Sequence, residues 1–213
     1  AELTASFDFP PDQIVYVFKV KTVDQYGNEG LEVSKSVEII ARPVVINEVA
    51  WAGTKADSHD EFIELYNRTS YAINLEGWTL YAEDSENPYI DLSGIISAGG
   101  YYLLERKDNN AISDVTADLT YGNDGPNWAL NNSGEVLALS YASTTIDETV
   151  LCSNRWCGGA AGGVYPTMER IDPDIAGTDS TNWGTSNSGA SNGFVKNGLD
   201  SAGAALTATP RAR

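Results

Sequence analysis

The sequence contains no apolar run of the length that a membrane-spanning helix requires. Such a helix needs ~20 consecutive apolar residues, and the apolar residues of this chain lie in shorter segments separated by polar ones. The first residues also lack the charged and then apolar segments of a secretory signal peptide. We therefore predict that the chain does not span a membrane and that any signal peptide has been removed.

Basic residues are scarce as well. The chain has 13 basic and 30 acidic residues, a formal net charge of −17, and 18 of the acidic residues lie in residues 43–150. Nucleic-acid phosphates need a basic surface, so the charge argues against nucleic-acid binding. An acidic surface attracts cations or basic partners, although a solvated surface with no specific partner is the more common meaning of such a pattern.

Cysteine and histidine are nearly absent. Cys152 and Cys157 are the two cysteines, and the single histidine, His59, is far away in sequence. No second cysteine pair or histidine cluster completes a zinc site. We predict a local disulfide, which implies an oxidising compartment outside the cytoplasm. The alternative is a pair of unbonded small residues in a glycine-rich loop.

The apolar pattern predicts an all-β chain, because no segment sustains the helical period of 3.6 residues. Residues 14–24 and 31–40 alternate between apolar and polar positions around a turn that contains Gly27 and Gly30, which predicts a β-hairpin. An isolated hairpin is marginally stable, so we expect it to pack on another domain, an upstream segment or a second copy. The hairpin resembles the end of an immunoglobulin-like or fibronectin-III-like domain. Residues 41–43 end it, since proline interrupts strand pairing.

Further short strands follow from residue 44 to residue 151. They are predicted at Val44–Trp51, Phe62–Tyr66, Ile73–Leu75, Trp78–Tyr81, Tyr89–Leu92, Tyr101–Glu105, Val136–Tyr141 and Thr145–Leu151. Residues 107–127 are expected to form a polar loop, and residues 129–130 to pair with 136–141 in a hairpin. The predicted organisation is an N-terminal hairpin (1–42), a β-sandwich (43–151) and an irregular extension rich in glycine, serine and asparagine that packs on the sandwich (152–213).

Five separated blocks carry a family resemblance. They are INEVAWAG (46–53), DEFIELYN (60–67), NLEGWTL (74–80), AGGYYLLER (98–106) and ALNNSGEVLAL (129–139). Together they resemble the lamin tail domain, and MERIDPD (168–174) and NGLDSAG (197–203) resemble its extended bacterial forms, which are secreted or lie at the cell surface. The resemblance implies an immunoglobulin-like β-sandwich without catalytic residues.

Four residues of these blocks are expected to build the fold. Trp51 and Trp78 are predicted core residues, with Trp78 filling the sandwich after a tight turn at Gly77. Gly134 is expected to supply the positive φ of a hairpin turn.

Catalytic arrangements find little support in the sequence. Glu61 and Glu64 are three positions apart on a predicted strand, so they point to opposite faces and cannot share acid–base work. His59 beside Asp60 could be a base with an orienting carboxylate, but no nucleophile motif lies nearby. We predict that the chain is not an enzyme and requires no cofactor.

Calcium is the better candidate for ion chemistry. Asp172, Asp174 and Asp179 surround Gly177, and calcium binds several oxygens of one flexible loop. The loop lacks the closing glutamate of an EF-hand, and an aspartate-rich turn that bonds its own backbone is the alternative. A second candidate combines residues 83–86 with Asp57 or Asp60.

The sequence thus predicts a non-catalytic structural or interaction module, secreted or at the cell surface. Its partners would be other proteins or its own copies, joined into a homo-oligomer or a filament when the hairpin adds strands to a neighbouring sheet. The alternative is a substrate- or carbohydrate-binding accessory domain of a secreted or surface enzyme. Aromatic platforms for sugars would come from Tyr81, Tyr89, Tyr101, Tyr102, Tyr121 and Trp128.

Overall fold

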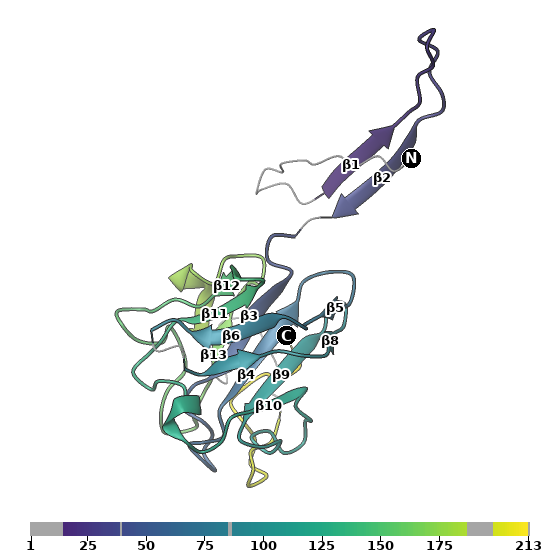
Figure 1. Cartoon of the computed structure of the whole chain (residues 1–213). Helices are drawn as coiled ribbons and strands as arrows, with labels where there is room; N and C mark the ends of the chain where they lie inside the picture. The colour runs from purple at the N-terminus through teal and green to yellow at the C-terminus, as the bar shows by residue number, and fades with distance from the viewer. Residues whose placement is uncertain (1–14, 39, 85–86, 187–197, 213) are drawn as a thin grey trace. The chain divides into compact units, whose positions relative to one another are not determined.

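The computed structural model describes residues 15–38, 40–84, 87–186 and 198–212 (Figure 1). The chain divides into a small unit, residues 1–41, and a large unit, residues 42–213. Within the described part, no helix is long and apolar enough to cross a membrane.

The small unit contains the predicted hairpin. Strand β1 (Val15–Val20) pairs antiparallel with β2 (Val33–Glu38). Asp24 shapes the chain between them, because its carboxylate accepts hydrogen bonds from the backbone N–H groups of Tyr26 and Asn28. The Asp24 carboxylate therefore stabilises the turn between β1 and β2.

The large unit is built from two main sheets. The larger sheet has the order β10-β9-β4-β3-β13-β14 and the smaller one β12-β11-β6-β7, beside a short β5-β8 pair. The larger sheet contains β3 (Val44–Ala50), β4 (Phe62–Asn67), β9 (Tyr101–Arg106), β10 (Leu119–Tyr121), β13 (Met168–Arg170) and β14 (Trp183–Thr185). The smaller sheet contains β6 (Trp78–Ala82), β7 (Tyr89–Asp91), β11 (Leu137–Tyr141) and β12 (Thr144–Glu148); the short pair is β5 (Ile73–Asn74) and β8 (Ile95–Ile96). The chain is thus all-β, as predicted, with the layers of an immunoglobulin-like sandwich.

The main core lies between the two sheets. Along β6, Trp78, Leu80 and Ala82 are buried, whereas Thr79 and Tyr81 are half-buried on the opposite face, as the two-residue period of a strand requires. Burying one such large apolar side chain stabilises the fold by roughly 1.5–3 kcal/mol.

Trp51 and Trp78 both belong to this core, with exposed fractions of 8% and 5%. Gly77 precedes Trp78 with a φ of +80°, a conformation that glycine adopts without a steric penalty. Gly134 has a φ of +114° and closes a turn by donating from its N–H to the carbonyl of Asn131, 2.9 Å away.

The outer face of the larger sheet is also covered, which explains why every residue of β3 is buried. A second apolar cluster forms there from strand, loop and C-terminal residues: Ala50, Phe62, Leu103, Ile112, Leu206 and Ala208. Residues 198–212, which we call the C-terminal segment, therefore pack directly against the sheet.

The structure corrects two local predictions. Residues 107–127 are not entirely loop, because β10 lies within them and pairs parallel with β9. Residues 129–130 form no strand; β11 instead pairs with β6 and, across a turn at Ala142 and Ser143, with β12. Both turn residues have positive φ, +48° and +65°, without the glycine that usually signals such a turn.

The described part of the extension after residue 151 is mostly irregular but also carries two strands. β13 pairs with β3 and β14 pairs with β13, so this segment extends the larger sheet.

η1 (Pro126–Trp128) and η2 (Ser180–Asn182) are single turns of 3₁₀ helix.

Candidate functional site

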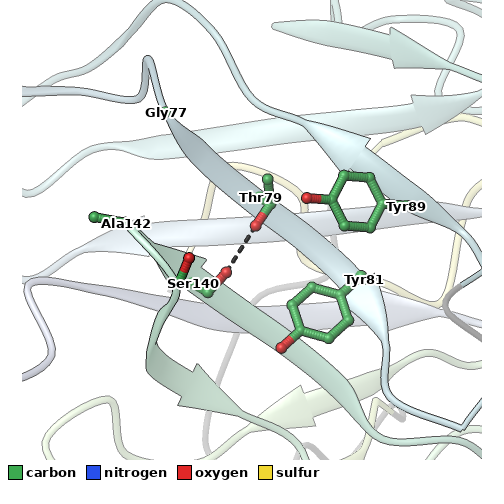
Figure 2. Close-up of a pocket in the computed structure, with 7 residues that line it drawn as sticks. Gly77, Thr79, Tyr81, Tyr89, Ser140 and Ala142 are labelled. Atoms are coloured by element: carbon green, nitrogen blue, oxygen red, sulfur yellow. Dashed lines mark hydrogen bonds between the residues drawn. The ribbon is translucent and has the colours of Figure 1, made fainter.

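The outward face of the smaller sheet carries a groove of about 530 Å³ (Figure 2). Its lining comes from β6, β7, β11 and the turn after β11: Gly77, Thr79, Tyr81, Tyr89, Ser140, Ala142 and Ser143. The groove has the size that small-ligand sites usually have. We call it the tyrosine groove.

Two stacked tyrosines form one wall of the tyrosine groove. Tyr81 and Tyr89 are cross-strand neighbours on β6 and β7, and their ring centroids are 5.9 Å apart with an interplanar angle of 27°. The side chain hydroxyls of Thr79 and Ser140 lie 2.7 Å apart beside them. Half of Tyr89 is exposed, at 49%. An apolar ring face next to hydroxyl groups suits a ligand that has both an apolar face and hydroxyls.

The other aromatic residues considered for sugar binding serve the fold. Tyr102 and Tyr121 are buried in the core, and the Tyr102 hydroxyl donates to the carbonyl of Ser93 at 2.7 Å. Trp128 packs against the core and closely over Gly122. Tyr101 lies against Tyr66 on the larger sheet.

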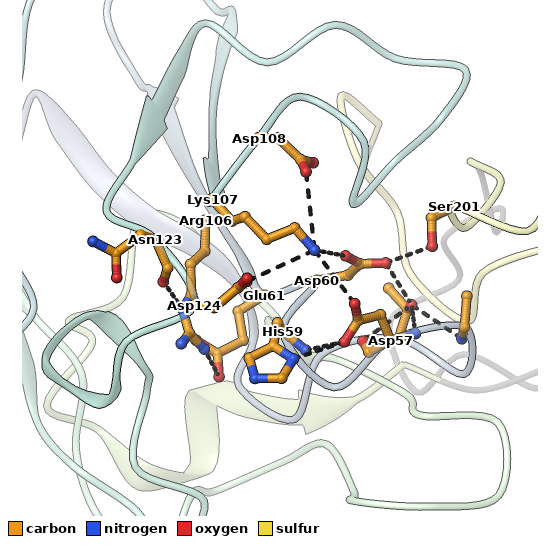
Figure 3. Close-up of polar contacts among 12 residues, drawn as sticks. Asp57, His59, Asp60, Glu61, Arg106, Lys107, Asp108, Asn123, Asp124 and Ser201 are labelled. Atoms are coloured by element: carbon orange, nitrogen blue, oxygen red, sulfur yellow. Dashed lines mark hydrogen bonds and ion pairs between the residues drawn. The ribbon is translucent and has the colours of Figure 1, made fainter.

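A polar network surrounds Lys107 at one end of the larger sheet (Figure 3). The Lys107 ammonium lies 3.3 Å from a carboxylate oxygen of Asp57, 3.9 Å from those of Asp60 and Asp108, and 3.8 Å from that of Asp124. Partial burial lowers the pKa of Lys107, but the neighbouring carboxylates of Asp57, Asp108 and Asp60 outweigh it and raise that pKa. The network ties three loops together around one cation.

His59 is oriented by Asp57 and not by Asp60, contrary to the pairing considered from the sequence. The two side chains meet at 2.9 Å, and hydrogen bonds from His59 lower the pKa of Asp57 to about 2. Asp60 instead accepts hydrogen bonds from Ser201 at 2.6 Å and Thr54 at 3.3 Å. The hydrogen bond from Ser201 attaches the C-terminal segment to the loop that carries Asp60.

Glu61, directly before β4, and Glu64, within it, point to opposite faces of the larger sheet, as the alternation predicts. Glu61 pairs with the buried Arg106 at 3.1 Å and accepts from the N–H of Leu130 at 2.9 Å, while burial raises its pKa to about 7. Glu64 accepts from the side chain amide of Asn47 at 3.0 Å on the other face. The two carboxylates therefore do not form a catalytic pair.

The three aspartates of the calcium candidate have separate partners. Asp172 accepts from the N–H of Asp174 at 2.8 Å, Asp174 pairs with Arg68 at 2.7 Å, and Asp179 accepts from the N–H of Thr181 at 2.9 Å. Across the described ranges, no group of three or more histidine, cysteine or acidic side chains could hold a metal ion. Calcium binding stays a prediction that these contacts do not support. The second candidate includes residues 85–86, which lie outside the described residues.

The predicted disulfide is present between Cys152 and Cys157. It closes a short loop, and Trp156 within this loop is buried against Trp51. The spacing of the two cysteines gives no sign of this contact between the loop and the core.

A buried acidic cluster on the outer face of the larger sheet was not predicted. Glu48 accepts from the Thr167 hydroxyl at 2.6 Å and from the N–H of Thr209 at 3.0 Å. Burial and the nearby Glu169 raise the pKa of Glu48 to about 8, and burial together with Glu48 raises that of Glu64. These carboxylates hold the C-terminal segment on the sheet.

One face of the hairpin presents apolar side chains to solvent beside Lys35, the cross-strand partner of Phe18. Val20 and Val33 are cross-strand partners and so lie on the same face, with exposed fractions of 66% and 69%. Phe18, two positions before Val20, shares this face. We call these three residues the hairpin face.

The model of the Lamin Tail Domain family matches residues 41–152. Among solved structures, a DUF4876 family protein from Bacteroides thetaiotaomicron is similar with a TM-score of 0.44 and 10% sequence identity, over 82% of this chain and 79% of that chain. No curated protein matches the chain significantly.

Proposed function

The chain belongs to the lamin tail domain family, and on that premise we propose that it is a non-catalytic interaction module, secreted or at the cell surface. Its hairpin would pair with the hairpin of a second copy. The disulfide between Cys152 and Cys157 supports a location outside the cytoplasm, since such bonds persist in oxidising compartments.

The exposed hairpin face is the observation that carries self-association. A two-stranded hairpin is marginal alone, whereas three or more strands with an apolar face are stable. Pairing two identical hairpins edge to edge gives four strands, satisfies open backbone groups and lets Val20 and Val33 of both copies form one larger apolar surface. Identical patches that meet in this way form a closed, two-fold dimer.

Sedimentation equilibrium over a range of concentrations tests this function. We expect the mass to approach twice that of the 22.8 kDa chain, and the Val20→Lys, Val33→Lys double variant to remain monomeric, because lysine charges would repel across the joined sheet. Val164→Lys is the matched control, since Val164 is a similarly exposed valine of the large unit, at 62%, and this variant should still dimerise. A wild-type chain that stays monomeric at high concentration would contradict the proposal, as would a double variant that dimerises normally.

The tyrosine groove favours a second function, the binding of a neutral saccharide. The stacked rings of Tyr81 and Tyr89 offer an apolar platform, and the Thr79 and Ser140 hydroxyls lie beside it. This arrangement supports the accessory-domain alternative and does not depend on the hairpin.

Replacement of Tyr89 by alanine is expected to weaken the binding of neutral oligosaccharides about tenfold, because loss of a ring contact of ~1.4 kcal/mol changes affinity by that factor. Isothermal titration with oligosaccharides of glucose and xylose would measure it. Tyr71→Ala is the matched control, since Tyr71 and Tyr89 have the same exposed fraction, 49%, but only Tyr89 lines the groove. Equal affinities for the two variants would remove the groove as a sugar site.

A further inference from the structure

A second pocket, of about 520 Å³, opens beside the disulfide loop of the large unit. Its lining includes Trp51, Asn132, Asn154, Arg155, Trp156 and Gly159. None of these residues lines the tyrosine groove. We call it the tryptophan pocket, and it requires neither the hairpin nor the tyrosine groove.

The loop that forms one wall of the tryptophan pocket is held in a fixed conformation. The Cys152–Cys157 disulfide closes it, and the backbone of Arg155 exchanges hydrogen bonds with that of Cys152, at 2.8 and 3.2 Å. Ser153 and Asn154 both adopt positive φ, +53° and +62°, which is uncommon for residues other than glycine. Such conformations persist where the surrounding structure enforces them, and they concentrate at ligand-binding sites.

The two tryptophans of the pocket are also fixed. Their rings are nearly parallel, with an interplanar angle of 8° and centroids 6.2 Å apart. The indole N–H of Trp51 donates to the carbonyl of Gly158 and that of Trp156 to the carbonyl of Asn131, both at 2.8 Å. With their polar atoms satisfied, the rings form a rigid wall, so a ligand would meet a site that needs little ordering.

Two glycines allow these walls to approach closely. A Cβ at Gly159 would lie 2.5 Å from the Trp51 indole nitrogen, and a Cβ at Gly134 would lie 2.7 Å from the Cα of Arg155. Any larger residue at either position would displace the wall. Gly134, predicted to serve a hairpin turn, therefore also positions the loop that carries Arg155.

Arg155 is an exposed cation in a strongly acidic chain. Arg68, Arg106 and Arg170 each pair with a carboxylate, whereas none of the described carboxylates forms an ion pair with Arg155. Its planar guanidinium can bind a carboxylate with two parallel hydrogen bonds. The side chain amides of Asn132 and Asn154 each offer both donors and acceptors, as sugar hydroxyls require.

We propose that the tryptophan pocket binds a short acidic saccharide, whose carboxylate pairs with Arg155 while its hydroxyls bond to Asn132 and Asn154. The net charge of −17 would repel a long polyanion, so the ligand is a short chain or a chain end. At physiological salt, charges more than ~8 Å apart are largely screened, which leaves the local cation to dominate.

Titration calorimetry of the full chain with trigalacturonate at physiological salt tests the proposal. We expect saturable binding, at least tenfold weaker binding of the methyl-esterified trisaccharide, and a similar loss for Arg155→Ala. Arg155→Lys should give an intermediate affinity, because lysine keeps the charge but loses the two parallel hydrogen bonds.

Lys55→Ala is the matched control, because it removes one exposed positive charge from a residue outside the pocket; its affinity should stay within twofold of wild type. Tyr89→Ala should also bind trigalacturonate normally, which separates this site from the tyrosine groove. The proposal is overturned if trigalacturonate shows no saturable binding at millimolar concentration, if the ester binds equally well, or if Arg155→Ala and Lys55→Ala behave alike.

Discussion

Replacement of Arg170 by methionine is expected to lower the free energy of unfolding of the large unit by about 3–5 kcal/mol, the usual cost of breaking a buried ion pair. The Arg170 side chain is fully buried and pairs with Asp147, whose side chain is 1% exposed. Methionine keeps most of the volume, so the loss would come from the unpaired charge of Asp147 and not from a cavity. Such a loss is a large part of the 5–15 kcal/mol that stabilises a typical domain.

Arg170 also joins segments that are far apart in the sequence. Its guanidinium donates to the carbonyl of Ile46 at 2.7 Å and to that of Ile175 at 3.0 Å. It also lies over the ring of Trp183, 4.9 Å from the centroid. Asp147 in turn accepts from the N–H of Ile46 at 2.9 Å. The pair therefore links β12 of the smaller sheet to β3 and β13 of the larger one.

Urea denaturation of the wild type, Arg170→Met, Asp147→Asn and the double variant would measure this effect. The double variant should be more stable than Arg170→Met, because neither buried charge is then left without its partner. Arg155→Ala, at an exposed position, should change stability by less than ~0.5 kcal/mol. A loss below ~1 kcal/mol for Arg170→Met, or a double variant as unstable as the sum of the single ones, would show that the pair is not needed.

The residue alternation predicted which way side chains point, but not what covers them. It predicted correctly that the Glu61 and Glu64 side chains point to opposite faces of the larger sheet. It gave no sign that Leu206, Ala208 and Thr209 would cover the face that carries Glu64, because contacts between residues so distant in sequence leave no periodic signal. The acidic cluster was missed for that reason.

The long strands were predictable, as were the short β5 and β7, whereas other short strands were not. β3, β4 and β9 have six or seven residues, enough to display a two-residue period. β10, β13 and β14 have three residues each and become strands only through their partners. Arg170 lies on β13, so the sequence could not reveal that this basic side chain is buried.

The candidate sites were predictable in part. The aromatic content predicted tyrosine platforms, but only the register of β6 with β7 brings Tyr81 and Tyr89 together. The two cysteines predicted the disulfide. Trp51 meets Trp156 only because the disulfide loop, more than 100 residues later in the chain, folds back onto the core. The spacing of the residues does not encode this contact.

The large unit is expected to be more stable at pH 5 than at pH 8, with Glu48 as a principal cause. The pKa of Glu48 is raised from 4.5 to about 8 in the fold by burial and by Glu169. Below pH 4.5, Glu48 is protonated in both the folded and the unfolded state, so its stabilising effect is fully present. As the pH rises toward 8 the unfolded chain releases this proton while the folded chain keeps it, and stability falls until the folded pKa is passed.

Other groups act in the same direction or are neutral in this window. Burial raises the pKa of Glu135 to about 8 and those of Glu61 and Glu105 to about 7. The lowered pKa of Asp57, about 2, contributes stability that is lost only in stronger acid. Thermal unfolding at several pH values from 5 to 8.5 should therefore show a melting temperature that declines with pH.

Glu48→Gln separates this cluster from the general repulsion of a chain with a net charge of −17. Glutamine is neutral at every pH and its side chain carbonyl can still accept from Thr167 and Thr209. The variant should therefore melt several degrees above wild type at pH 8, differ little at pH 5, and show a flatter pH profile. Asp91→Asn removes the same charge from an exposed position on β7 and should shift the whole profile only slightly. Only a buried group that keeps its proton confines the loss of stability to the window between pH 4.5 and about 8. If the two variants show the same dependence of melting temperature on pH, the net charge governs that dependence and the buried Glu48 carboxylate does not.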